Sequence, residues 1–250
     1  MWVAMPRCLV VQHVEPEEAF AIGEALRASD VRIETCRVYA GDPVPTDTSG
    51  LDGLVVMGGP MSAGSSGGFP TRDAEVALLA DALRTGVPTL GVCLGAQLVA
   101  VAGGAAAYRG ASGPEIGWGP VTLGAECRDD RLFGGLPETL TVLHWHGDTF
   151  DLPVGGRRLI GNARYDNQAF RLGSAAWGVQ FHLEVTRRAV TGFLTEFASD
   201  LEGSGTTSGA IRAATAKALE ALAPARDQVC GRFAALVAER VPRQDLIELA

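Results

Sequence analysis

A single cysteine stands between two glycines where a run of apolar residues ends. In the stretch "TLGVCLGAQLVA", Cys93 lies in the pattern Gly-x-Cys-x-Gly, with Gly91 before it and Gly95 after it. Residues 87–92 predict a short buried strand, and residues 95–102 predict the start of a helix. Glycines tolerate the strained backbone and the close approach of a sharp strand-to-helix turn. The pattern therefore predicts a nucleophile elbow that presents the Cys93 thiol at its tip.

The position of Cys93 also predicts a reactive thiol. The helix start behind it offers free N–H groups and a positive partial charge, and these lower the pKa of a thiol. The alternative is that Cys93 is simply a buried apolar residue, since cysteine is often buried. The other cysteines are widely scattered, so neither a disulfide framework nor a zinc site is predicted. They are Cys8, Cys36, Cys127 and Cys230.

The composition is that of a globular protein of one large or two small domains. The chain has 250 residues, of which 47% are hydrophobic and 20% are charged. Its net charge of −8 argues against a nucleic-acid partner. No apolar run approaches a membrane span, and the first residues do not resemble a signal peptide. We expect a cytoplasmic protein without membrane contact or cofactor.

Strand and helix patterns alternate over the first hundred residues. Strands are predicted at 8–12, 31–38 and 51–57, and helices at 15–28 and 73–85. This alternation predicts an α/β fold with an open, mostly parallel or mixed sheet covered by helices on both faces. Ligands bind such sheets outside the carboxyl ends of the strands. Cys93 lies at one such end, and the pair Gly58 and Gly59 lies at another.

The second half predicts shorter strands, then a tail. Strands are predicted at 120–123, 139–143, 158–163, 168–172 and 176–182, followed by a helix at 186–201. Residues 202–209 have the composition of a flexible linker. We therefore expect a main domain over 1–201 and a C-terminal helical extension over 210–250, with two amphipathic helices broken at Pro224. Their apolar faces need a surface, either the core or a second copy of the chain.

A nucleophilic cysteine needs a base, and the base needs an orienting group. His182 in "GVQFHLE" ends the last strong strand, and Glu184 lies on the same face of the extended chain. Such a carboxylate fixes the tautomer of the imidazole, although His-x-Glu alone also fits a solvated strand end. His13 is interpreted as a surface or loop histidine. His144 and His146 have a spacing that allows a metal, but no third ligand stands nearby, so no metal site is predicted.

Several motifs together resemble a known family. The segments "VVMGGP", "GVCLGAQ" and "GVQFHLE" resemble those of class I, triad-type glutamine amidotransferases, which have a flavodoxin-like sheet. The segments "EIGWGPV", "HWHGDTFDLP" and "NQAFRLG" resemble the stand-alone proteins related to the glutaminase domain of GMP synthase. The resemblance covers roughly residues 8–201. The loop at 61–73 departs from it, because it is unusually rich in Gly and Ser, and we recognise no synthase or ATP-binding domain.

The resemblance implies roles for particular residues. Cys93 would attack the γ-carboxamide of glutamine, His182 would move the protons, and Glu184 would orient His182. Backbone N–H groups of Gly59 and Leu94 would form the oxyanion hole.

The resemblance also implies a set of substrate-binding residues. Gly58 belongs to the glycine pair, and Gln97 lies one helical turn beyond the nucleophile. The segment from Trp145 through Gly147 to Asp148 resembles the loop that contacts the head of glutamine. The alternatives for Gln97 and Trp145 are an exposed helix residue and a packed aromatic.

Three functions stay open at this point. The chain is a glutaminase subunit that releases ammonia for a separate synthase, or a stand-alone γ-glutamyl hydrolase or transferase acting on a peptide or conjugate. The third alternative is a non-catalytic scaffold with the same fold. Glutamine or another γ-glutamyl small molecule is the expected ligand, and the C-terminal helices are the expected surface of any homo-oligomer.

Overall fold

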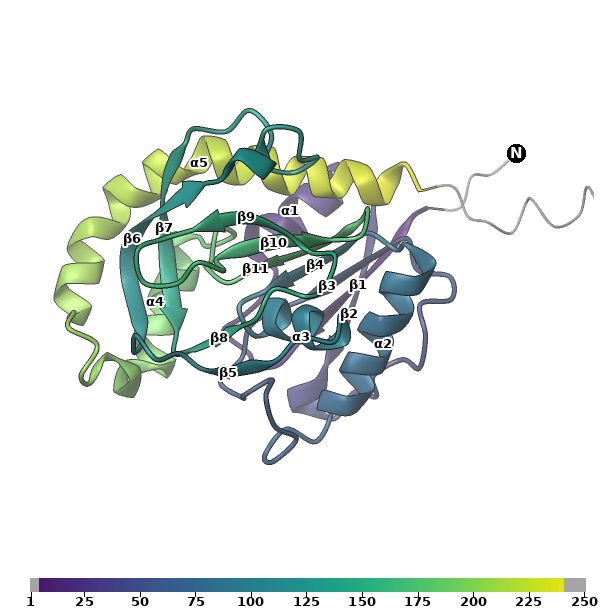
Figure 1. The fold of residues 1–250 in the computed structure, drawn as a ribbon, viewed down its shortest axis with the longest axis horizontal. Helices are drawn as coiled ribbons and strands as arrows, with labels where there is room; N and C mark the ends of the chain where they lie inside the picture. The colour runs from purple at the N-terminus through teal and green to yellow at the C-terminus, as the bar shows by residue number, and fades with distance from the viewer. Residues whose placement is uncertain (1–4, 241–250) are drawn as a thin grey trace, which may run out of the picture.

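A nine-stranded mixed sheet forms the centre of the molecule (Figure 1). The computed structural model describes residues 5–240. The strands, in spatial order, are β2 (Arg32–Arg37), β1 (Arg7–Gln12), β3 (Gly53–Val56), β4 (Thr89–Val92), β11 (Ala176–Val179), β10 (Ala169–Leu172), β9 (Arg157–Gly161), β6 (Glu115–Leu123) and β7 (Thr139–His146). The first five strands in this order, from β2 to β11, pair in parallel. The other four strands, β10, β9, β6 and β7, pair antiparallel with their neighbours. The predicted open mixed sheet is confirmed.

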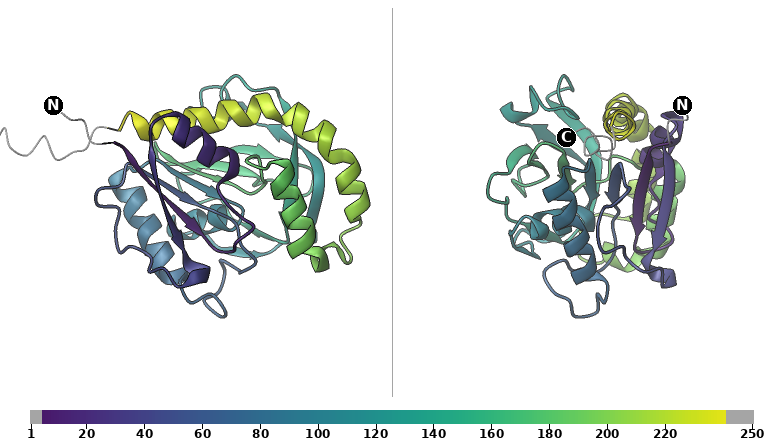
Figure 2. Two further views of the ribbon diagram at one scale, coloured as in Figure 1. Left: turned by 180° about the vertical axis from the view of Figure 1, so that it is seen from behind. Right: turned by 90° about the vertical axis from the view of Figure 1, so that its right-hand side faces the viewer.

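Helices cover both faces of the sheet. The helices α2 (Arg72–Thr85) and α3 (Leu94–Ala102) pack on one face through a core cluster that includes Leu79 and Leu98. The opposite face is covered by α1 (Phe20–Ala28) and α5 (Ser208–Ala238), which lie side by side in the left view of Figure 2. Helix α4 (Arg187–Glu196) packs beside β7, and β5 (Ala107–Arg109) and β8 (Asp148–Phe150) form a separate small sheet.

The segments that carry the sequence motifs meet at one edge of the sheet. His13 follows β1, Gly58 follows β3, Cys93 follows β4, and His182 lies three residues after β11. These four strands are neighbours and run parallel, so their carboxyl ends lie together. This is where an open α/β sheet binds its ligands.

Helix α5 differs from the sequence prediction of two helices broken at Pro224. It is one helix of 31 residues, Ser208–Ala238, with Pro224 inside it, and it bends along its length (Figure 1). A proline removes a helical hydrogen bond and kinks the helix. Leu222 and Ala225 on either side of Pro224 are both buried, so packing stabilises the helix across the proline. Neither α5 nor any other helix within residues 5–240 is long and apolar enough to cross a membrane.

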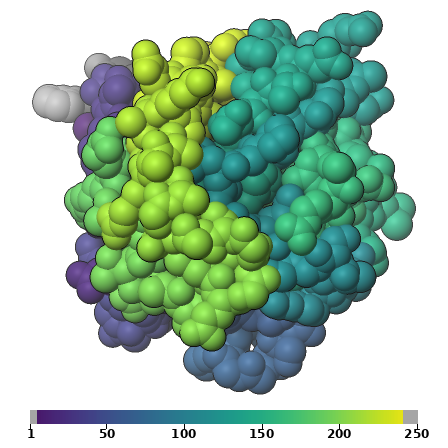
Figure 3. All heavy atoms as spheres, turned by 90° about the vertical axis from the view of Figure 1, so that its left-hand side faces the viewer, coloured from purple at the N-terminus to yellow at the C-terminus, as the bar shows by residue number. Residues whose placement is uncertain are grey.

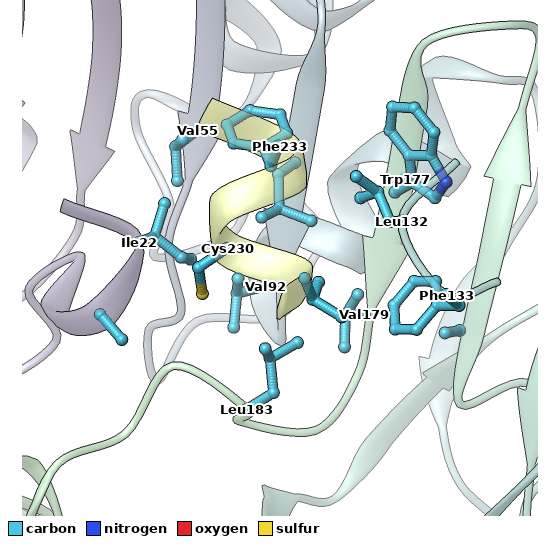
Figure 4. Close-up of a cluster of buried hydrophobic side chains, with 14 of the residues drawn as sticks. Ile22, Val55, Val92, Leu132, Phe133, Trp177, Val179, Leu183, Cys230 and Phe233 are labelled. Carbon is cyan, nitrogen blue, oxygen red and sulfur yellow. The ribbon is translucent and has the colours of Figure 1, made fainter. Parts of the chain in front are cut away.

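The apolar stripe of α5 is part of the main core. In Figure 4, Phe233 and Cys230 from α5 lie among Val55, Val92 and Val179 of the sheet. All five side chains are at most 1% exposed. In Figure 3 the yellow-green atoms of α5 form a band between the N-terminal segments and the strands drawn in teal. Of the two surfaces expected for the tail, the core of its own chain is the one that α5 covers, and residues 241–250 of the predicted extension lie outside the described residues.

The first helix begins later than its apolar pattern predicts. Helix α1 starts at Phe20, whereas the prediction placed the start at residue 15. Phe20 has a positive φ of 35°, so the chain turns sharply just before the helix. The segment before this turn is not helical, and Glu17 within it is only 5% exposed. The Glu17 carboxylate, which would face solvent if the helix began at residue 15, is therefore buried.

Candidate active site

Cys93 occupies a strained turn between β4 and α3. Its backbone has φ 53° and ψ −107°, a conformation that few residues other than glycine adopt. A Cβ atom on Gly91 would overlap the carbonyl of Gly95, and a Cβ atom on Gly95 would overlap the carbonyl oxygen of Val56. Both glycines are therefore required by close backbone approach, as the sequence pattern predicts. The elbow is also tied to β11, since the Cys93 N–H donates to the Val179 carbonyl at 2.8 Å.

His182 and Glu184 form a buried pair behind Cys93. The distance between His182 Nδ1 and Glu184 Oε1 is 2.7 Å, and each residue is at most 1% exposed. The His182 N–H donates to the Leu143 carbonyl at 2.8 Å, which fixes the backbone of this segment against β7. Because Nδ1 faces Glu184, the Nε2 atom is left for the side-chain hydrogen bond with Cys93. His182 thus lies between the Glu184 carboxylate, which it contacts directly, and the Cys93 thiol, whose pKa it influences.

The charges around His182 favour the transfer of a proton to its imidazole. Burial lowers the pKa of His182, but the charge of Glu184 and the hydrogen bonds to Cys93 and Glu184 outweigh burial, so the pKa lies well above its ordinary value. Burial raises the pKa of the Cys93 thiol, and the hydrogen bond from His182 opposes this only in part. The lowered thiol pKa predicted from the helix start is therefore wrong. A thiolate at this site, 7% exposed, loses most of its hydration.

A cavity of about 480 Å³ opens in front of the thiol. Its volume lies in the range of small-molecule sites. Its walls include residues from the elbow, from the glycine pair and from the turn between β7 and β8. Among them are Gly59, Leu94, Gln97, Trp145, Gly147 and Asp148.

The residues predicted to bind substrate differ in their surroundings. The amide Nε2 of Gln97, which is 3% exposed, donates to Gln180 at 3.1 Å, so Gln97 is not an exposed helix residue. The carbonyl of Trp145 accepts from Cys93 Sγ at 3.6 Å, and its ring nitrogen donates to Asp200 at 3.1 Å. The carboxylate of Asp148 accepts from Ser62 at 2.7 Å, which ties the Gly/Ser-rich loop to the cavity wall.

The glycine pair is held from behind by side chains that the sequence motifs did not identify. His13 is 2% exposed, and its Nδ1 lies 2.9 Å from the Gly58 carbonyl oxygen. It lies in the loop after β1, as one of the two interpretations has it, but it is not a surface histidine. Its Nε2 lies 2.7 Å from Oε2 of the buried Glu75. The carboxylate of Glu17 packs against the Cα of Gly58. The sequence could have indicated His13 and Glu17 by their position, because the segment "QHVEPE" lies at the end of the first strand, on the ligand-binding edge of the sheet.

An acidic side chain lies next to His144 and His146. The structure brings Glu115 within 3.1 Å of His146 Nε2 and 3.7 Å of His144 Nδ1, so the third ligand missing from the sequence argument exists. The three side chains offer ligand atoms within 4.8 Å of one another. However, His146 Nδ1 also lies 2.9 Å from the Asp148 carbonyl oxygen, so both ring nitrogens of His146 face hydrogen-bond acceptors. A metal at His146 would have to break one of these hydrogen bonds, whereas both ring nitrogens of the buried His144 have no hydrogen-bond partner among the described residues.

Comparison with known protein families identifies the family of this chain. The sequence profile described as "Glutamine amidotransferase class-I" matches residues 19–198, well over half of the chain. The chain belongs to the class I glutamine amidotransferase family. The matched segment contains Cys93, His182 and Glu184.

Curated relatives of this amidotransferase include parts of larger enzymes. The glutamine-hydrolyzing GMP synthase of Porphyromonas gingivalis is 39% identical over 153 residues, which are 60% of this chain but only 28% of that enzyme. The glutamine amidotransferase-like protein YfeJ of Salmonella typhimurium is 34% identical over 173 residues, 68% of this chain and 72% of its own. A separate subunit of the glutamine-hydrolyzing GMP synthase of Thermoplasma acidophilum is 31% identical, with 60% of this chain and 71% of its own covered.

Solved structures share the fold along nearly the whole chain. A glutamine amidotransferase from Thermotoga maritima superposes with a TM-score of 0.83 at 28% identity, covering 94% of this chain and 99% of its own. A glutamine amidotransferase from Methylobacillus flagellatus gives a TM-score of 0.83 at 25% identity, covering 96% and 98%. Coverage this high extends past residue 201, so the shared fold reaches into α5.

Replacing Glu17 by glutamine is expected to stabilise the amidotransferase above neutral pH. Burial raises the pKa of Glu17 from 4.5 to about 7, so the folded protein keeps a proton that the unfolded chain releases near pH 4.5. Stability therefore falls as the pH rises from 4.5 to about 7. The full difference corresponds to about 3 kcal/mol, which the neutral amide avoids.

Urea unfolding of the wild type and of Glu17→Gln at pH 4.5 and pH 8 measures this difference. The two proteins should differ little at the lower pH, and the variant should be the more stable at the higher one. Glu196→Gln on the exposed face of α4 is the control, and its effect should not depend on pH. An equal effect of Glu17→Gln at both pH values would contradict the buried, protonated carboxyl.

Proposed function

We propose that this amidotransferase hydrolyses the γ-amide of glutamine through a γ-glutamyl thioester on Cys93 and releases ammonia for a separate synthase. The observation that carries the proposal is the buried pair of Glu184 and His182 next to Cys93, whose thiol lines the cavity. His182 Nδ1 is 2.7 Å from Glu184, and His182 and Cys93 each influence the pKa of the other. Such an arrangement suits nucleophilic acyl transfer, because base and orienting group are already aligned.

In the first half of the proposed reaction, His182 Nε2 takes the thiol proton while the Cys93 sulfur attacks the amide carbon. The carbonyl oxygen becomes an oxyanion, which the N–H groups of Gly59 and Leu94 stabilise. The C–N bond then breaks, and His182 returns its proton to the leaving nitrogen, so that ammonia departs. Glu184 stabilises the imidazolium that exists between these two proton transfers.

In the second half, water replaces ammonia. His182 removes a proton from the water as its oxygen attacks the thioester carbon, and the same oxyanion hole stabilises the second tetrahedral intermediate. Collapse of this intermediate breaks the C–S bond, and the proton on His182 returns to the Cys93 sulfur. Glutamate leaves, and the site is restored.

Relatives support the part of the proposal that concerns a separate synthase. The Thermoplasma acidophilum relative is named as one subunit of a GMP synthase, and 71% of its length is covered by this chain. A stand-alone γ-glutamyl hydrolase is the alternative from which a comparison of substrates distinguishes this proposal.

A glutamine-like diazo-ketone tests the nucleophile. We expect it to label Cys93 alone, as shown by peptide mapping, with protection by glutamine and no label in Cys93→Ala. Glutamate release should be measured in parallel for glutamine and for a panel of γ-glutamyl peptides. Preference for the peptides would favour the hydrolase. Labelling of the other cysteines with Cys93 spared, or silence on every substrate without labelling, would refute the proposal.

A further inference from the structure

His13 lies directly behind the glycine pair, at the end of β1. Strands β1 and β3 are parallel neighbours, and Val11 pairs with Val56, so the residues that follow them continue side by side. The His13 side chain is fully buried. Its Nδ1 lies 2.9 Å from the Gly58 carbonyl oxygen, and its Cβ would be 2.8 Å from a Cβ atom built on Gly59. His13 therefore touches both glycines.

The partners of His13 determine which of its atoms carry protons. The Gly58 carbonyl can only accept a hydrogen bond, so Nδ1 must carry a proton and donate. The other ring nitrogen, Nε2, lies 2.7 Å from the carboxylate of Glu75. Whether the second proton of this pair lies on the imidazole or on the carboxyl, Nδ1 remains the donor to Gly58. The hydrogen bond therefore runs from His13 to the Gly58 carbonyl, and the contact with Glu75 holds the imidazole in this orientation.

Glu75 is itself held in place. It lies in the first turn of α2 and is 1% exposed. Its Oε1 accepts a hydrogen bond from the Thr71 hydroxyl at 2.7 Å, and Oε2 faces His13. Both carboxylate oxygens therefore have partners. The chain from Thr71 through Glu75 and His13 to Gly58 is continuous and buried along most of its length.

The carbonyl of Gly58 and the N–H of Gly59 belong to the same peptide group. This peptide is trans, so the carbonyl and the N–H point in opposite directions. Holding the Gly58 carbonyl toward His13 turns the Gly59 N–H away from His13. Gly59 lines the cavity in front of Cys93, so an N–H turned away from His13 is free to face that cavity.

A second buried histidine shows the same pattern across the cavity. His146 Nδ1 lies 2.9 Å from the Asp148 carbonyl oxygen, and its Nε2 lies 3.1 Å from Glu115. Each histidine thus joins a buried carboxylate to a backbone carbonyl of a segment that borders the cavity. The repetition indicates that these pairs hold loops in position.

We propose that His13, held by Glu75, is a positioning residue that orients the Gly58–Gly59 peptide so that the Gly59 N–H faces the oxyanion. The inference rests on the proposed function, because it assigns a task to a donor of that reaction. It also predicts a separate property. The site should stabilise the oxygen of any tetrahedral adduct in which a former carbonyl carbon is bonded to the Cys93 sulfur.

The test compares two variants of His13 in the full chain. His13→Leu removes the donor to Gly58. His13→Asn keeps one, because the amide nitrogen of asparagine is bonded to Cγ, as Nδ1 of histidine is. The probe is 5-oxopentanoate, the aldehyde analogue of glutamine without its amino group. The thiol of Cys93 adds to its carbonyl, forming a C–S bond while the thiol proton moves to the oxygen.

We expect His13→Leu to bind the aldehyde about 10- to 100-fold more weakly, less than the roughly 100- to 1,000-fold cost of removing an oxyanion donor outright. On glutamine, kcat should fall by a similar factor, with KM little changed. His13→Asn should lie close to the wild type in both measurements. Alkylation of Cys93 by iodoacetamide, in which sulfur displaces iodide and no oxyanion forms, should proceed at the same rate in all three proteins.

Equal aldehyde affinities of His13→Leu and the wild type would overturn the proposal, as would an equal loss in His13→Asn. A fall in iodoacetamide alkylation that matches the other losses would show general damage to the site and would also overturn it. If the wild type binds the aldehyde but hydrolyses no glutamine, the proposed function fails while the aldehyde comparison still decides the role of His13. Should His13→Leu not fold, Thr71→Val removes the hydroxyl behind Glu75 and is expected to give the same pattern at smaller size.

Discussion

Replacing His182 by alanine is expected to remove nearly all turnover of glutamine. Under the proposed mechanism His182 takes the thiol proton, delivers it to ammonia and later activates the water. General acid–base groups contribute about a hundred- to ten-thousandfold to a rate, and one residue serves both halves of this reaction. The high pKa of His182, caused by Glu184 and Cys93 against the effect of burial, favours its role as the proton acceptor.

Glu184→Gln is expected to cost less than His182→Ala. Its amide oxygen still accepts from His182 Nδ1, which is 2.7 Å from the carboxylate, but its charge no longer stabilises the imidazolium. Steady-state glutamate release measures both variants, and Glu196→Gln on the exposed face of α4 is the matched control. Wild-type kcat in His182→Ala on a confirmed substrate would contradict the assignment. So would a larger loss in Glu184→Gln than in His182→Ala.

Replacing Gly95 by alanine is expected to damage both the fold and the elbow. A Cβ atom at Gly95 would overlap the Val56 carbonyl oxygen and lie 2.7 Å from its carbon. This neighbour is backbone of β3, so no side-chain rotation relieves the overlap and the elbow or the strand must move. Overpacking of a well-packed core costs about 1–3 kcal/mol and sometimes more, and a clash between two backbones belongs at the upper end.

The same substitution at Gly231 is the matched control. Gly231 lies inside α5, and a Cβ atom there meets no atom within 4 Å. Alanine is favoured over glycine in a helix by about 0.8–1.0 kcal/mol, so Gly231→Ala should stabilise the protein. Urea unfolding of both variants, with diazo-ketone labelling of Cys93, checks the contrast. A Gly95→Ala protein as stable and as readily labelled as Gly231→Ala would show that the elbow does not need its glycine.

The role of the C-terminal helix depends on contacts that its own sequence does not contain. Pro224 predicts a break, because it lacks the N–H that a helix interior needs. The structure keeps one helix, since the residues on both sides of the proline belong to one buried stripe. Leu222 before it and Val229 after it are each 1% exposed. Long-range packing against α1 and the sheet therefore overrides a local rule.

Local pattern alone determined the elbow and the general fold of this amidotransferase. The alternation of short apolar strands with amphipathic helices predicted the mixed sheet. Gly91 and Gly95 around Cys93 predicted a sharp turn, because the need for glycine is a local steric property of that backbone. The two-residue spacing of His182 and Glu184 likewise placed them together, since their separation depends only on the adjacent backbone.

The support behind the glycine pair was decided only by tertiary structure. His13 and Glu75 are 62 residues apart in sequence, and no motif of the sequence connects them. They meet because β1 and β3 are adjacent and α2 packs over them. Burial then changes their chemistry, since polar groups removed from water must find partners among the few atoms in reach. A sequence pattern contains no record of which distant group becomes that partner, so the contact of His13 with Gly58 was visible only in the fold.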